Sequence, residues 1–296
     1  MLNLSVEHQR TIAEIKRIRL AMTVEQIPTA EGFSTVIEKV GSFFTSKLKM
    51  IAGLLSSFSS DNREIIKSGK LNGYQVQLET IKGKLKWVEK NVPNIAPIAQ
   101  DTLPTIVGMR VSLYEVIGLL DKEIPTLINY IVGEVKTVSY IANKLLADES
   151  YRKTNMINFD NKNISARLAS VESIIENIID PKSRADRLPL EKIISNISGL
   201  KNGYDTLFKL GNNLSNETLG ELVSATEKID DKIADIVNMI ERNTFTVSKN
   251  MLEAFSSRVE LVASLISGGM SLFFIYMQSV DMFIKIVEYI ENKANK

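Results

Sequence analysis

The chain has 296 residues, 44% of them hydrophobic and 24% charged, a composition that is typical of folded globular proteins and argues against disorder along the whole length. Its 36 Lys and Arg residues nearly balance 35 Asp and Glu residues, so no overall field attracts nucleic acid or an anionic membrane. The chain has no cysteine, which excludes disulfides, thiol nucleophiles and Cys-based zinc or iron–sulfur sites.

Residues 1–30 are predicted to form an N-terminal amphipathic segment. Apolar residues such as Ile12 and Ile15 alternate with charged ones, which predicts a short helix that ends before Pro28. The segment lacks the continuous apolar core of a secretory signal, so we expect no signal peptide.

Residues 31–92 are predicted to form a helical hairpin. Thr35 and Glu38 make a capping box in front of an apolar pattern of helical period, which lasts to a serine cluster at 56–60. Asp61 is the expected cap of the second helix. Three glycines in that helix predict packing contacts or bends, because each weakens a helix relative to alanine: Gly69, Gly73 and Gly83.

Residues 93–104 are the predicted linker, because a helix cannot continue through three prolines spaced so closely. Residues 105–296 then form the expected main helical bundle. Its predicted parts are an antiparallel helix pair whose second member begins at Pro125, a polar loop at 148–163, helices near 164–179 and 189–210, and one long C-terminal helix at about 218–293.

The most apolar stretch lies inside that C-terminal helix, from Leu261 to Val280, and contains no charged residue. Its length is that of a transmembrane helix, so a membrane span and a buried core helix are the two interpretations. Polar residues interrupt it at helical spacing and continue on both sides as a narrow stripe, which favours a core helix with one polar edge. The stripe comprises Arg242, Thr246, Lys249, Glu253, Ser257, Glu260, Ser264, Ser267, Ser271, Gln278, Asp281, Lys285, Glu288 and Asn292.

Within this stretch we single out eight residues for helix packing. Large apolar side chains are expected to anchor the helix, while small residues four apart let a partner helix approach closely. The anchors are Leu261, Leu265, Leu272, Phe273 and Ile275, and the small residues are Ser264, Gly268 and Ser271.

Residues that carry enzyme chemistry are scarce. The single histidine, His8, is expected on an exposed surface, and without a second histidine or a cysteine the His-based metal sites and nucleophile–base pairs are excluded. No phosphate-binding glycine loop occurs. The adjacent carboxylates Asp230 and Asp231 are interpreted as solvated groups on a charged helix face. We therefore expect no enzyme activity, no cofactor and no metal.

Two segments resemble the internal head proteins of giant tailed bacteriophages. One is the region 92–139, with its prolines, the Gly108-Met109 pair and the apolar stretches VSLYEVIGLL and PTLINYIVGEV, and the other is NTFTVSKNMLEAFSSRVELVASLI near the C-terminus. The resemblance implies a helical, non-enzymatic protein that is packaged with the genome and trimmed by a prohead protease after Ser/Ala-x-Glu. Processing would then follow Glu7, which ends a Ser-Val-Glu sequence, and Glu25 or Glu31 as looser matches; Ser170-Val171-Glu172 also fits the rule.

The sequence thus predicts an all-α protein, an elongated bundle of seven to nine helices with one long C-terminal helix. The expected function is that of a structural protein inside a phage virion, made in the host cytoplasm, with other virion proteins or further copies of itself as partners. The alternative is an α-helical pore-forming or membrane-perturbing protein in which 261–280 leaves the bundle and enters a bilayer.

Overall fold

The computed structural model describes residues 70–92, 111–154, 159–178, 196–214, 216–242 and 247–295, together with scattered positions between 45 and 63. Every regular element in this part of the chain is an α-helix, which confirms the predicted fold class. The helices are α3 (Lys70–Asn91), α4 (Leu113–Ala147), α5 (Glu149–Lys153), α6 (Lys162–Ile178), α7 (Ile197–Asn213), α8 (Asn216–Glu241) and α9 (Lys249–Ala294).

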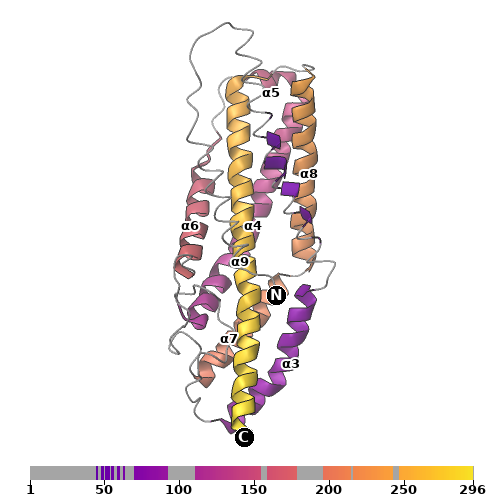
Figure 1. Ribbon diagram of the computed structural model, residues 1–296. Coiled ribbons are helices and arrows are strands. Elements are labelled where there is room, and N and C mark those ends of the chain that lie inside the picture. The colour runs from indigo at the N-terminus through magenta and orange to yellow at the C-terminus, as the bar shows by residue number, and fades with distance from the viewer. Residues whose placement is uncertain are drawn as a thin grey trace.

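The bundle is elongated, and α9 runs along almost its entire length (Figure 1). With 46 residues, α9 is about 69 Å long at 1.5 Å per residue. In Figure 1, α8 and α6 flank its first half, whereas α3 and α7 flank its second half, and α4 accompanies it across the middle. The hydrophobic core is therefore organised around α9.

Helix α4 is a single helix where the sequence predicts two. Ser112 begins it with a full capping box, in which the Ser112 hydroxyl accepts from the Glu115 N–H and the Glu115 carboxylate accepts from the Ser112 N–H. The helix then continues through Pro125 to Ala147, so the predicted antiparallel pair is wrong. Proline removes one backbone hydrogen bond, but an unbroken apolar stripe through Ile117, Ile124 and Ile131 keeps both sides of it buried.

The predicted C-terminal helix at 218–293 is instead two helices, α8 and α9. Helix α8 ends at Glu241, and Ser248 caps a new helix by accepting a hydrogen bond from the Met251 N–H. The chain reverses direction between them, as Figure 1 shows. The polar periodicity continues across this break because both helices bury an apolar face, so Arg242 and Thr246 do not belong to the same helix as the rest of the predicted stripe.

The described positions between 45 and 63 are helical, including Ser56, Ser59 and Ser60, where the sequence predicts a helix end. Two ion pairs attach this stretch to α8, from Lys49 to Glu241 and from Arg63 to Glu227. From the first pair to the second, the residue number rises from 49 to 63 in this stretch and falls from 241 to 227 in α8, so the two run antiparallel.

Several other predictions concern the flanking parts of the bundle. A Cβ atom on Gly73 or Gly83 of α3 would meet no other atom within 4 Å, so these two glycines mark no close packing contact. The predicted loop at 148–163 contains the short helix α5. Residues 1–30 and 93–104, with Glu7, His8, Glu25, Glu31 and Gly69, lie outside the described residues.

Candidate functional site: the middle of α9 and its ion pairs

The start of α9 is fixed to the ends of α4 and α5. The Ser248 hydroxyl donates to the Thr154 carbonyl at 2.9 Å, and the Ser248 N–H donates to the Arg152 carbonyl at 2.9 Å. The Arg152 guanidinium in turn donates to the carbonyls of Leu145 and Leu146, which end α4 without helical partners of their own. The register of α9 against α4 is therefore set at this end of the bundle.

The predicted anchor residues of α9 are inside the bundle. Leu265 and Leu272 are fully buried, Ile275 and Phe273 are nearly so, and Leu261 is 9% exposed. Phe273 also packs its ring edge-on against Phe274. Helix α9 packs against α3, α4, α6 and α7, which makes it the central helix.

The predicted small residues lie where α6 meets α9. A Cβ atom on Gly268 would stand 2.9 Å from Cγ1 of Val171, closer than two carbon atoms can approach. Ser264 and Ser271, one turn away on either side, are 4% and 3% exposed. The close helix partner at this position is α6 of the same chain. Val171, the middle residue of the predicted Ser170-Val171-Glu172 processing sequence, is buried in that contact.

The polar stripe is exposed toward both ends of α9, as predicted, at Lys249, Glu253, Lys285 and Asn292, but it is partly buried in the middle of the helix. In the middle of α9, Glu260 is 1% exposed and Ser264 and Ser271 are also buried, as is Ser279 beside the stripe. Serine tolerates this burial because its hydroxyl bonds to the preceding turn of its own helix, as Ser279 does to the Ile275 carbonyl at 2.7 Å. Ser267 and Gln278 are half-buried.

A buried ion pair joins α9 to α4. The Arg258 guanidinium lies 2.5 Å from a carboxylate oxygen of Glu134, and their side chains are only 11% and 15% exposed. The same guanidinium donates to the Asp160 carbonyl at 3.3 Å and to the Asn161 side chain at 3.4 Å, just before α6 begins. Arg258 thus connects three helices through one planar group.

A second ion pair joins α6 to α4, between Arg167 and Glu123 at 3.5 Å.

Tyr130 lies one turn from Glu134 on α4. Burial, together with the nearby Glu134 carboxylate, raises the pKa of the Tyr130 hydroxyl, so this tyrosine stays neutral at physiological pH.

Sequence reasoning missed this charged group. Glu123, Tyr130 and Glu134 occur at helical spacing among buried residues of α4, and Glu123 is 9% exposed. Carboxylates at core positions of a helix predict buried cationic partners, because an unpaired buried charge is strongly destabilising. That signal is present in the sequence, although it does not identify which Arg is the partner.

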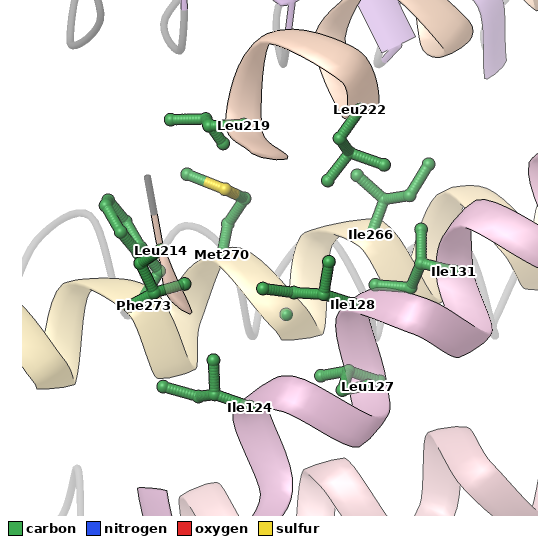
Figure 2. Close-up of a pocket in the computed structure, with 11 residues that line it drawn as sticks. Ile124, Leu127, Ile128, Ile131, Leu214, Leu219, Leu222, Ile266, Met270 and Phe273 are labelled. Atoms are coloured by element: carbon green, nitrogen blue, oxygen red, sulfur yellow. The ribbon is translucent and has the colours of Figure 1, made fainter. Parts of the chain in front are cut away.

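An apolar cavity of about 40 Å³ lies between α4, α8 and α9. Figure 2 shows the side chains of Leu127 and Ile131 from α4 and of Ile266, Met270 and Phe273 from α9 around it. All eleven lining residues are aliphatic, aromatic, methionine or glycine. The cavity therefore offers no polar group that could orient a substrate or bind a metal ion.

Elsewhere in the described residues, no group of three or more His, Asp or Glu side chains could hold a metal ion. Asp230 of α8 is partly buried, and burial together with the neighbouring Asp231 raises its pKa, whereas Asp231 is exposed. Asp230 is therefore only partly solvated, whereas Asp231 lies on the exposed helix face that the sequence predicts.

Helix α9 is the one helix of the described part that is long and apolar enough to cross a membrane, judged by length and composition alone. In the structure, 72% of its most apolar window is buried against the rest of the chain. The core helix of a soluble bundle passes the same test of length and composition as a membrane span, so the test by itself is weak evidence for a span.

Comparison of the chain with protein-family models, with curated protein sequences and with solved structures finds no match in any of the three.

Proposed function

We propose that this protein is a non-enzymatic structural protein of a phage virion, located inside the head, where it acts through helix–helix contacts with other virion proteins or with further copies of itself. The observation that supports a structural role is the way in which α9 packs inside the bundle. Most of its apolar stretch is buried against the rest of the bundle, and its buried Arg258 is paired with Glu134 of α4.

The chemistry of the candidate site supports a packing role. Ion pairs join helices in the middle of the bundle, between Glu134 and Arg258 and between Glu123 and Arg167. The cavity beside them is wholly apolar. The location in a virion rests on the resemblance of 92–139 and of the segment that begins α9.

The decisive experiment is mass spectrometry of purified virions from the source of this chain. The proposal expects the chain in intact particles, with an N-terminus that begins after Glu7, Glu25 or Glu31 if it is trimmed. Particles that lack the chain would refute the virion role. An intact Met1 in particles that contain the chain would remove only the processing step.

A pore-forming function is the second candidate, and the absence of charge from Leu261 to Val280 is the observation that favours it. The two functions require different things of α9, so two substitutions separate them. In a bundle protein, Phe273→Ala removes a buried ring and should lower the free energy of unfolding by about 3–5 kcal/mol. Ser267→Lys should be mild, because a half-buried lysine can extend its amine to water.

In a pore former, Ser267→Lys would instead place a charge near the middle of a membrane span, at a cost of about 2.5–3.5 kcal/mol on insertion scales. We expect that the unmodified protein does not release dye from phospholipid vesicles. Strong leakage that Ser267→Lys abolishes, with the soluble fold retained, would replace the structural proposal with the pore-forming one.

A further inference from the structure

The cavity between α4, α8 and α9 is a space of about 40 Å³ that the side chains of the lining helices do not fill. Well-packed protein interiors contain few voids larger than a water molecule. A void of this size lowers the folding equilibrium constant by roughly fivefold, because the atoms around it lose van der Waals contacts. A molecule that fills the space recovers part of that loss.

The cavity persists because its walls are held apart by the helices that carry them. On one side α4 and α9 are already in contact, since a Cβ atom on Gly269 would stand 3.1 Å from Cδ1 of Ile131 and 3.4 Å from Cδ2 of Leu127. On the other side, Leu219 and Leu222 come from α8, which packs against α4 much more than against α9. The space therefore follows from the positions of three backbones and does not depend on a single rotamer.

The lining favours an apolar molecule over water. Its described side chains are all aliphatic, aromatic or methionine. One water needs only about 10–15 Å³ of such space, but a buried water also needs about two to four polar partners. Water gains no hydrogen bonds by entering this site, whereas an apolar molecule that enters it leaves water for surroundings that suit it better.

Two lining residues mark the side on which the cavity lies closest to solvent. Ile128 of α4 and Met270 of α9 are half-buried, whereas Ile124 and Leu127 are buried. Figure 2 shows the Met270 side chain extending from α9 toward Leu219 of α8. Methionine is unbranched and has three rotatable bonds, so rotation of this one side chain provides an entrance while the helices stay in place.

We propose that this cavity is a binding site for small apolar molecules of about the size of a xenon atom or a short alkane. Dry apolar cavities of about 150 Å³ take up benzene as well as xenon, so a cavity of about 40 Å³ with the same kind of lining admits the atom and excludes the ring. The dissociation constant is on the order of millimolar, because so small a molecule makes few contacts. The site depends only on the folded chain, so it is independent of the proposed virion role.

Methyl NMR spectra of the full, unmodified chain under xenon pressure test the site. Saturable shifts should appear at the methyl groups of Leu127, Ile131 and Met270, and they should be absent at Leu85 and Leu200, which are buried in α3 and α7 away from the cavity lining. Xenon at about ten times its dissociation constant should raise the folding equilibrium constant about elevenfold. Shifts that do not saturate, or that are equally large at Leu85 and Leu200, overturn the proposal.

A substitution that fills the cavity should remove binding. Ile128→Phe extends a larger side chain from α4 into the space, so the affinity for xenon should fall at least about tenfold. The matched control is Val132→Phe, which adds the same ring to a half-buried residue one turn further along α4 that does not line the cavity. The control should retain the xenon affinity within about twofold, and an equal loss in both variants counts against the site.

A substitution that enlarges the cavity gives an independent result, should Ile128→Phe perturb folding. Leu222→Ala shortens one wall in α8, so benzene should bind to this variant and not to the unmodified protein. Xenon should bind to both. Failure of xenon to bind to either protein overturns the proposal, and equal affinity of both proteins for benzene overturns the size limit.

Discussion

The hydroxyl oxygen of Tyr276 in α9 lies 2.6 Å from the point that a Cβ atom on Gly211 of α7 would occupy. Tyr276 is almost fully buried and donates from this hydroxyl to the Leu207 carbonyl at 3.2 Å. Burial raises the pKa of the hydroxyl, which keeps it protonated and able to donate. Helix α7 therefore approaches α9 as closely as it does because residue 211 has no side chain.

Gly211→Ala should lower the free energy of unfolding by about 1–3 kcal/mol, since overpacking a buried contact forces neighbouring groups to shift. Urea denaturation measures the change. In a Tyr276→Phe background, the methyl group has room, so the alanine should cost much less there than in the wild type. If the changes in the free energy of unfolding from Gly211→Ala and Tyr276→Phe were simply additive, the close contact between the two residues would be contradicted.

Gly268→Ala should also be destabilising, by about 1–3 kcal/mol, because Val171 of α6 occupies the space that the methyl group needs. Adding Val171→Ala should recover part of that loss, so the double variant should be more stable than the sum of the single changes implies. Gly118→Ala is the control. Its Cβ atom would meet nothing within 4 Å on an exposed part of α4, and higher helix propensity should make it neutral or up to about 1 kcal/mol more stable.

Arg258→Met should cost about 3–5 kcal/mol in thermal or urea unfolding, because it leaves the Glu134 carboxylate without its buried cation. Combining it with Glu134→Leu should restore most of the stability, since two apolar side chains replace the pair without an uncompensated charge. Lys49→Met breaks a comparable but exposed pair with Glu241 and should change stability by at most about 1 kcal/mol. If Arg258→Met and Lys49→Met lowered the free energy of unfolding equally, burial would not be what makes the pair between Arg258 and Glu134 important for stability.

Asp281→Asn should stabilise the protein at neutral pH. Burial raises the native pKa of Asp281, although the Tyr74 hydroxyl and the nearby Lys285 partly oppose that shift. The folded chain therefore holds this proton to higher pH than the unfolded chain, whose carboxyl titrates near about 3.9. Stability from the protonated group is present below that pH and is lost as pH rises through the native pKa.

Unfolding of wild type and Asp281→Asn across the acidic and neutral range measures this effect. The stability advantage of the variant should be greatest at neutral pH and should disappear in acid, because the neutral amide and the protonated acid are then equivalent. Asparagine still accepts from Tyr74, so the contact itself is kept. A difference that does not depend on pH would contradict the raised pKa.

Periodicity in the sequence was sufficient to predict the helical fold and the central place of 261–280. A helix that buries one face must repeat apolar residues every three or four positions, and that signal survives without any knowledge of the neighbours. The same pattern correctly put Leu265, Leu272 and Phe273 on buried faces. It also predicted a close approach near Gly268, because a glycine between two serines on an apolar helix leaves room for another backbone.

Only the tertiary structure decided where helices continue, where they break and which residues pair with the buried charges. Pro125 costs a helix the same hydrogen bond in any context, and packing on both sides of it determines that α4 continues. The break between α8 and α9 depends on the contacts of Ser248 with Thr154, far away in sequence. Glu134 and Arg258 are 124 positions apart in the sequence. A charged residue at helical spacing is therefore predicted to be exposed until its distant partner is known. Local patterns specify helices because the helix period is local, whereas the neutralisation of a buried charge depends on which distant residue the fold brings beside it.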